Sequence, residues 1–230
     1  DVRAYMDKLA GALEAVLGGK LGDHIRALFC DSIELSGANI TDDLFEEFRK
    51  RRGYDLQPFV PLVFYHPYEG YTDTLRYDSE FNADIHRIRY DFNRTLVELF
   101  LERLTKTFDD WANEHNMQSR YQAYGMPWLA GMLDGYRMVD IPESNNWLFS
   151  GNAKAHGYWI WNKYTSSGAH LSGAPIVSCE AMTNTQGVFR TSLETIKQSD
   201  DMNFITGINH TVLHGFNYSP PEVPFPGWVR

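Results

Sequence analysis

Acidic residues follow three short apolar runs of the sequence, where carboxylates could do chemistry. Asp31 and Glu34 follow the first of these runs, Glu143 follows another, and Glu180 ends the run PIVSC. If the runs are strands of a parallel sheet, their carboxyl ends meet at one edge, which is where such folds bind ligands. Gathered like charges repel one another, and a fold tolerates them when chemistry or a cation offsets the cost.

Such a cluster of carboxylates has two uses. Two carboxyl groups can break a glycosidic bond, one protonating the leaving oxygen while the other activates water or attacks the sugar. Carboxylate oxygens can also hold a hard cation such as Ca²⁺. The structural alternative is that each acid caps a helix or pairs with an arginine. The placement of the acids at strand ends favours a functional cluster over three unrelated structural acids. It does not decide between catalysis and cation binding.

Aromatic and neutral polar residues surround the acids, as expected around a sugar. Aromatic residues make up 14% of the chain, and flat rings pack against the apolar faces of pyranoses. Trp159 and Trp161 fit the core face of a helix better than a sugar platform. The candidates for sugar contacts are Tyr121, Gln122, Tyr124, Trp147, His214 and Asn217.

Composition argues against several other functions. The formal net charge of −9 disfavours a nucleic-acid partner, which needs clustered Lys and Arg. The sequence has no apolar run long enough to predict a membrane span. It also lacks HExxH and GxSxG motifs, so zinc and serine-hydrolase chemistry find no support. We expect Cys30 and Cys179 to be buried free thiols.

Strand-like and helix-like patterns alternate along the chain, which predicts βα units and a parallel sheet. An amphipathic helix opens the sequence, and the loop 53–78 is predicted to be an insertion over the sheet. The predicted strands are 25–34, 117–125, 136–144, 175–181 and 209–219. The other predicted helices are 41–52, starting from a Thr41 cap, 79–114, 151–166 and 189–200.

Two α/β folds fit five parallel strands. One is an open doubly wound sheet, but no GxGxxG or GxxxxGK[ST] turn supports its nucleotide-binding versions. The other is a parallel (β/α)₈ TIM-type barrel of which the chain holds strands four to eight. The acids at strand ends favour the barrel, with residues 1–230 forming one partial catalytic domain of a larger chain.

Several motifs together resemble glycoside hydrolase family 106, the α-L-rhamnosidase family. They are FCDSIELSGANITDDLFEEFRKRRGYDLQPFVP, YQAYG, VDIPES, PIVSCEA and VLHGFNYSPPEVPFPGW. The similarity runs from about residue 20 to the C-terminus. It implies a large, multidomain bacterial enzyme with a barrel catalytic domain and β-sandwich domains, exported to the periplasm or outside the cell.

The resemblance also implies a mechanism and a ligand set. Members of the family are inverting and calcium-dependent, which by motif makes Glu34 the general acid and Glu180 the general base. Asp31 and Glu143 fall where calcium ligands would be useful. The substrate would be a rhamnose-containing oligosaccharide, polysaccharide or glycoside, and the partners within the protein its remaining barrel strands and accessory domains.

Two segments, DIPESNNW and MTNTQG, depart from the expected family pattern near the sugar. The identity of the sugar therefore stays open at this point. One alternative is an exo-glycosidase for another sugar on the same barrel. The other is a carbohydrate-binding protein of barrel descent without catalysis, which would have no need of two glutamates facing one bond.

Overall fold

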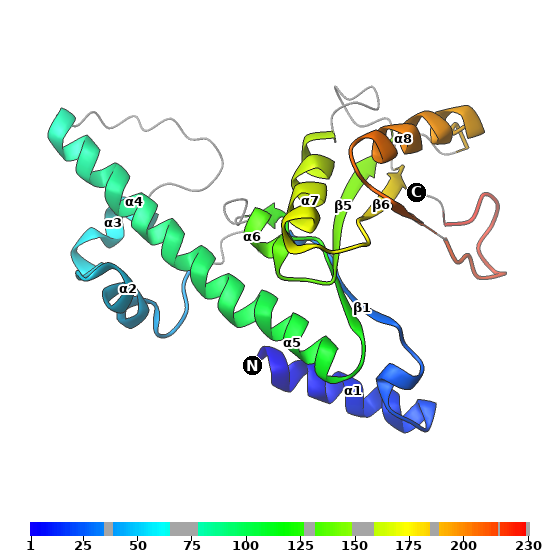
Figure 1. Ribbon diagram of the computed structural model, residues 1–230, viewed down its shortest axis with the longest axis horizontal. Helices are drawn as coiled ribbons and strands as arrows, with labels where there is room; N and C mark the ends of the chain where they lie inside the picture. Colours follow the sequence, from blue (N-terminus) through cyan, green and yellow to red (C-terminus); the bar gives the residue numbers. More distant parts are fainter. Residues whose placement is uncertain are drawn as a thin grey trace.

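The computed structural model of the chain shows an α/β fold, in which a five-stranded parallel sheet forms half of a TIM-type barrel (Figure 1). The structure describes residues 1–34, 39–64, 78–126, 132–148, 159–184, 189–215 and 217–228. The strand order is β1-β3-β5-β6-β7, in which every neighbouring pair is parallel. The strands are β1 Ala27–Cys30, β3 Gln118–Tyr121, β5 Ile141–Trp147, β6 Ser178–Thr183 and β7 His210–Leu213.

A second, two-stranded sheet prolongs β1 and β3. It pairs β2 (Ile33–Glu34) with β4 (Gly125–Met126), also in parallel. Each of the predicted runs 25–34 and 117–125 is thus two strands separated by a short break. The backbone of Gln122 still bonds to Cys30 O, and Ile33 N bonds to the carbonyl of Tyr124 across the break.

Two predicted strands end later than expected, which moves two acids from strand ends to strand interiors. Helix α6 (Met132–Arg137) takes the start of the predicted strand 136–144, and β5 continues to Trp147. Strand β6 likewise continues past Glu180. A strand tolerates polar residues in its interior when they find buried partners, and the sequence pattern does not reveal those partners.

The helices match the predicted periodicity with shifted ends. The chain opens with α1 Val2–Leu17, and α4 Ser79–Phe100 and α5 Lys106–Glu114 fall within the predicted helix 79–114. A π-helical segment, Leu101–Thr105, joins α4 to α5, so the predicted helix 79–114 is one continuous rod (Figure 1). The remaining major helices are α2 Leu44–Arg52, α3 Val60–Phe64, α7 Trp159–Ser172 and α8 Leu193–Ile205.

Three of these helices correct the predicted bounds. The N-cap of α2 is Asp43 rather than Thr41, and Gly53 ends it in the left-handed conformation with φ 82°. Helix α7 extends past the predicted end at 166, and residues 151–158 of that prediction lie outside the described residues. Helix α8 starts four residues later than 189, at Leu193, where Ser192 caps it.

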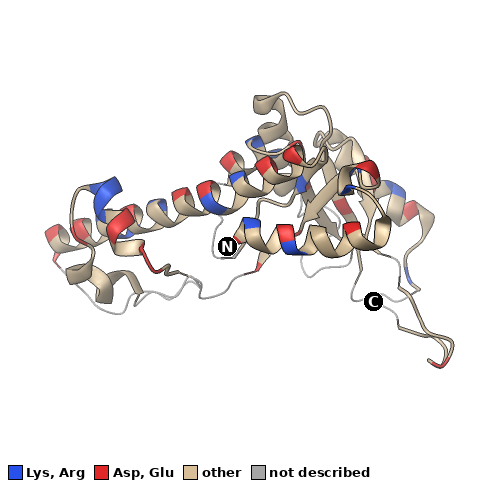
Figure 2. Cartoon of the chain, turned by 90° about the horizontal axis from the view of Figure 1, so that it is seen from below, with Lys and Arg blue, Asp and Glu red and all other residues tan. Residues whose placement is uncertain are grey.

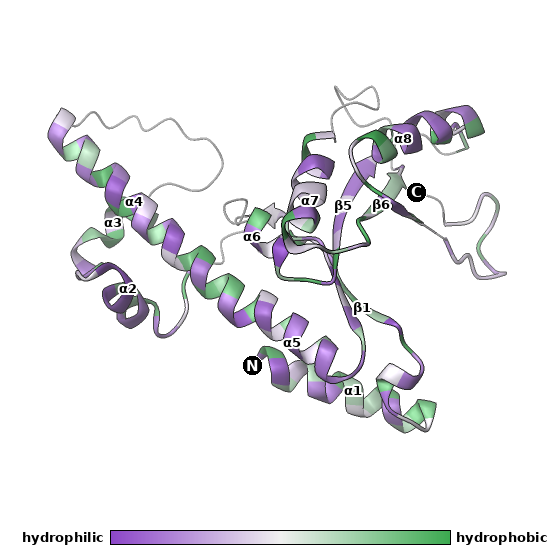
Figure 3. Cartoon of the chain, in the orientation of Figure 1, coloured by the Kyte–Doolittle hydropathy of each residue, from purple (hydrophilic) through white to green (hydrophobic). Residues whose placement is uncertain are grey.

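An arm projects from the sheet along the rod. It consists of α2, α3 and most of α4, packed around their own core of Leu44, Phe48, Leu56, Val63, Ile88, Phe92, Leu96 and Leu99. Figures 1 and 3 show this arm at one end of the rod, with hydrophobic and hydrophilic residues alternating around the turns of α4. The described part of the predicted insertion, 53–64, therefore packs in the arm and not over the sheet.

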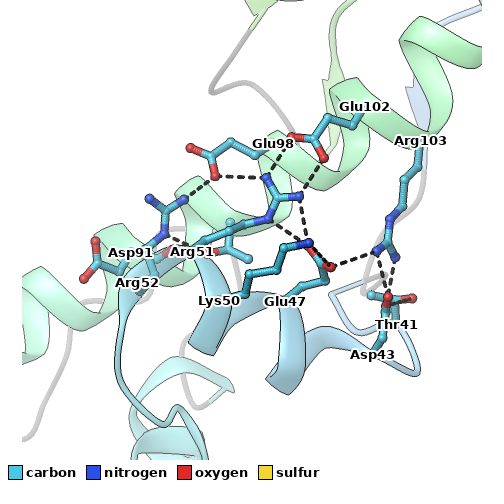
Figure 4. A network of polar contacts seen from close by, with 11 residues as sticks. Thr41, Asp43, Glu47, Lys50, Arg51, Arg52, Asp91, Glu98, Glu102 and Arg103 are labelled. Carbon is cyan, nitrogen blue, oxygen red and sulfur yellow. Dashed lines mark hydrogen bonds and ion pairs between the residues drawn. The ribbon is translucent and has the colours of Figure 1, made fainter.

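Ion pairs join helix α2 to the rod. Arg51 on α2 contacts Glu47 of its own helix at 2.9 Å and Glu102 at 2.6 Å. Arg52 contacts Glu98 at 2.5 Å, and Figure 4 shows these arginines facing the carboxylates of the rod. The basic residues that end α2 thus form ion pairs, and their positive charges also interact favourably with the C-terminal end of the helix dipole.

The helix side of the sheet packs against two further cores. One lies against α1, α5 and α6 and includes Trp111, Tyr121 and Tyr136. The other joins β6 to α7 and α8 and includes Cys179 and Ala181. Lys, Arg, Asp and Glu are interspersed along the helices (Figure 2). Within the described ranges, every helix is too short or too polar to cross a membrane.

Candidate active site

One face of the sheet carries a connected set of polar side chains. Successive residues of a strand point to opposite faces, so Ser178 and Glu180 of β6 share a face, while Cys179 and Ala181 point to the helices. In the sheet register Glu143 of β5 lies beside Ser178. Arg120 and Gln122, two residues apart on β3 and just after it, complete this polar face.

Each oxygen of the Glu180 carboxylate has a polar neighbour. Gln122 Nε2 donates to Glu180 Oε2 at 2.6 Å, and His214 Nδ1 lies 2.8 Å from Oε1. The side chain of Glu180 is 18% exposed and that of His214 is 50% exposed. The hydrogen bond at Nδ1 of His214 is the one to Thr183 Oγ1, at 2.9 Å, and Glu180 lies in ion-pair contact with the same nitrogen.

Glu143 is fully buried, at 0% exposed, and both of its oxygens are engaged. Arg120 Nη2 and Gln122 Nε2 each donate to Oε1 at 3.1 Å. Ser178 Oγ donates to Oε2 at 2.5 Å, and Arg120 Nε forms an ion-pair contact with Oε2 at 2.5 Å without hydrogen-bond geometry. The guanidinium also lies 4.2 Å over the ring of Phe29, which shields it from water.

Tyr124 connects this network to the first acidic segment. Its hydroxyl donates to Gln122 Oε1. Burial raises the pKa of Tyr124 far above its usual range, and the charges of Glu180 and Asp31 raise it further. The phenol therefore stays protonated as a donor. The backbone carbonyl of Tyr124 also accepts a hydrogen bond from Ile33 N at 2.9 Å, so the same residue contacts the segment that follows Asp31.

Glu34 lies on β2, at the end of this converging segment. Its carboxylate is exposed, and Ser32 Oγ lies 3.5 Å from Oε1. Asp31 is exposed as well and accepts a hydrogen bond from Ser32 N at 2.7 Å. Strand β2 is held in place by its parallel pairing with β4, in which Ile33 lies beside Gly125.

Three other predicted contacts lie apart from the polar network. Tyr121 is buried on the opposite face of β3, with its ring centroid 6.1 Å from that of Phe108 in the helix-side core. Trp147 is half-buried at the end of β5, in register with Thr183. Asn217 is exposed in the segment that follows β7. Alternation along β3 separates Tyr121 from Gln122, which the sequence analysis had grouped together.

The two predicted calcium ligands have different surroundings, since Asp31 is exposed and Glu143 is fully buried. Among the described residues, no three His, Cys, Asp or Glu side chains are grouped to hold a metal ion. At Glu143, a cation would have to displace Arg120, whose guanidinium keeps its charge at any ordinary pH. The donor set around Glu143 suits a buried ion pair and not calcium.

The sequence analysis missed Arg120, Ser178 and Thr183. Arg120 and Ser178 each stand two residues before a predicted site residue, Gln122 and Glu180, and so share its face of the sheet. This spacing was the available signal. Arginine inside a predicted buried strand was a second one, since a buried cation requires a partner.

A bulge in β6 shapes the chain just beyond Glu180. The register moves from Asn145 opposite Glu180 to Trp147 opposite Thr183, so β6 contains one extra residue there. Met182 takes a positive φ of 66°, and its N–H donates to Asn146 Oδ1 at 2.6 Å. The bulge places Thr183 where its hydroxyl meets His214, on the face that holds Glu180.

A half-barrel with carboxylates on its polar face is compatible with a glycoside hydrolase. The chain belongs to the alpha-L-rhamnosidase family, glycoside hydrolase family 106, whose model matches residues 1–229. A rhamnosidase from Novosphingobium sp. PP1Y has a similar fold, with a TM-score of 0.72 and 24% sequence identity. That match covers 100% of this chain and 22% of the solved one.

A relative from Formosa agariphila carries a different activity in its name. It is 27% identical over 209 residues, and its provisional name is beta-glucuronidase. The match covers 90% of this chain and 16% of the relative. The chain thus spans about a fifth of the length of the proteins it matches.

Proposed function

We propose that the protein hydrolyses terminal α-L-rhamnosyl bonds, with Glu34 as general acid and Glu180 as general base. The observation that carries this proposal is the setting of Glu180, between the amide of Gln122 and the ring of His214. A hydrogen bond on one oxygen and the His214 ring beside the other orient the carboxylate and still leave it partly exposed. Family membership supports the choice of reaction.

In this mechanism Glu34 gives its proton to the glycosidic oxygen as the bond from that oxygen to the anomeric carbon breaks. Glu180 takes a proton from a water molecule that attacks the anomeric carbon from the opposite face. The product then has the inverted anomeric configuration, which requires a carboxyl separation of about 6.5–9.5 Å. Proton NMR of the first product formed would reveal inversion, and a retained anomer would contradict this part of the proposal.

The charges of the site favour rhamnose over a uronic acid. A uronate is usually held by arginine or lysine. Within the described part of the site, Arg120 is committed to Glu143, and His214 already contacts Glu180. Rhamnose carries no carboxylate and needs no such cation. The second candidate substrate, a β-glucuronide, rests on the name of the Formosa agariphila relative.

The test is release of nitrophenol from nitrophenyl α-L-rhamnoside by the full-length protein and its Glu180→Gln variant. Loss of the base should lower kcat by about 10² to 10⁴. Glu46→Gln changes an exposed glutamate of α2 and should behave as wild type. A nitrophenyl β-D-glucuronide in the same assay compares the two sugars.

Two results would contradict the proposal. If Glu180→Gln keeps the wild-type rate, Glu180 is not the base. If the wild-type protein cleaves neither glycoside but binds rhamnose in calorimetry, the protein is a carbohydrate-binding module. Preferential cleavage of the glucuronide would keep the enzyme class and change the sugar.

A calcium requirement is a separate proposal, based on the family resemblance. It is tested by assaying the protein after dialysis against a chelator and again after Ca²⁺ is restored. We expect activity to fall and recover. Because Glu143 is paired with Arg120, a Glu143 variant should leave the calcium affinity measured by calorimetry unchanged.

A further inference from the structure

Glu143 is a carboxylate of the polar face that neither substrate nor metal can reach in this arrangement. It is fully buried, and Arg120, Gln122 and Ser178 engage its two oxygens. Burying a carboxylate is costly unless it is paired, and the ion pair with Arg120 meets that cost without explaining why the acid is there. The position next to Gln122 provides an explanation.

The amide of Gln122 can take only one orientation. Its Nε2 faces two carboxylates, Glu143 Oε1 at 3.1 Å and Glu180 Oε2 at 2.6 Å, and both of these only accept. Its Oε1 accepts from the hydroxyl of Tyr124, which stays protonated. Rotating the amide by half a turn would place its oxygen against two carboxylates and its NH₂ against a donor.

We propose that Glu143 is a positioning residue for Glu180 and acts through the amide of Gln122. The proposal rests on the role of Glu180 as the base in the proposed function. Arg120 and Ser178 hold Glu143, Glu143 and Tyr124 hold the amide of Gln122, and this amide fixes one oxygen of Glu180. Gln122 then serves the base and not the sugar, because its donors and its acceptor are already used.

This arrangement acts on the rate of the reaction more than on binding. A general base must be placed accurately against the attacking water, and a shift of about 1 Å can cost about 10² in rate. Binding of the sugar does not depend on that water. Glu143→Gln in the full-length protein should therefore lower kcat by about 10- to 100-fold with KM changed by less than about 3-fold.

A double-mutant cycle tests whether Glu143 acts through Gln122. Gln122→Met keeps the length of the side chain and removes its donors. If the proposal holds, adding Glu143→Gln to Gln122→Met lowers kcat by less than about 3-fold further, since the connecting amide is already gone. If the two losses multiply, Glu143 acts independently and the proposal is overturned. An unchanged kcat in Glu143→Gln would also overturn it.

Two additions keep the test decisive. If Glu143→Gln fails to fold, Ser178→Ala removes one hydrogen bond to Glu143 and keeps the ion pair, and the same cycle with Gln122→Met applies.

Crystal structures of the variants report on the position of Glu180 independently of activity. If the wild-type protein cleaves no glycoside, the proposed function fails. The link from Glu143 to Glu180 is still supported if the crystal structure of the variant at residue 143 or 178 shows the Glu180 carboxylate turned away from residue 122. An unmoved carboxylate overturns it.

Discussion

Gly125 lies directly against the backbone of Ile33. A Cβ atom on Gly125 would come within 1.9 Å of the Ile33 carbonyl oxygen, and the glycine has a φ of 133° that other residues rarely adopt. Both the contact and the conformation therefore require glycine. Because Glu34 follows Ile33 on β2, this contact sets the position of the proposed general acid.

Gly125→Ala should lower activity by displacing β2. The methyl group would push the backbone of Ile33 away, and Glu34 would move with it. We expect a loss of about 10² in kcat from a displacement of about 1 Å. Gly53→Ala is the matched control, because that glycine also has a positive φ but has open space around it. Equal activity losses in both variants would contradict this role of Gly125.

Glu34→Gln should show an effect that depends on the leaving group. An alkyl alcohol needs a proton to depart, whereas dinitrophenolate does not. The variant should lose about 10² to 10⁴ in kcat on methyl α-L-rhamnoside and less than about tenfold on the dinitrophenyl rhamnoside. Glu180→Gln should lose similar factors on both substrates. A Glu34 variant with equal losses on both would exclude Glu34 as the acid.

Arg51→Met should destabilise the arm. Arg51 is 19% exposed and contacts Glu47, Glu98 and Glu102, which would repel one another without it. We expect a decrease of about 1–2 kcal/mol in the free energy of unfolding by urea. Arg49→Met provides the control, since Arg49 is 63% exposed, and should cost less than about 0.5 kcal/mol. Equal costs would mean that the network does not stabilise the arm.

Cys30 should react slowly with iodoacetamide in the folded protein. Cys30 is half-buried and not fully buried as predicted, and this partial burial, followed by the charge of Asp31, raises the pKa of its thiol to about 11 from an ordinary value of 9.0. Two units of pKa lower the thiolate fraction at pH 8 by about 100-fold. The rate, followed by peptide mass spectrometry, should still rise between pH 9 and 10. In urea the unfolded protein should react fully within minutes at pH 8. Equally fast reaction of the folded protein would contradict this environment of Cys30.

The sequence predicted the class of fold and the convergence of the acids. The strand and helix periodicities are local, so the parallel sheet and the helix 79–114 could be predicted from them. Asp31 and Glu180 could be expected to converge, because parallel strands direct their carboxyl ends to one edge. In the structure Tyr124 contacts both segments, since its hydroxyl bonds to Gln122, the partner of Glu180, and its carbonyl accepts from Ile33 N.

The contacts between distant segments could not be predicted in the same way. Glu143 was predicted as a strand-end acid that binds calcium, and its partner Arg120, 23 residues away in the sequence, could not be predicted from local pattern. The arm has its own core because α2 and α3 meet α4, and no local pattern gives the direction in which a loop packs. The close approach of Gly125 to Ile33 of β2 is likewise a tertiary contact.

The π-helical segment sets the rotational phase between the two halves of the rod. Leu99 packs in the arm core, whereas Phe100 and Leu104 pack on the core beside the sheet. One residue turns an α-helix by about 100°, and a wider turn absorbs part of such an angle without breaking the helix. Deleting one residue from 101–105 would leave both halves helical but swing the arm around the axis of the rod. The length of this one segment therefore determines the direction in which the arm points from the barrel.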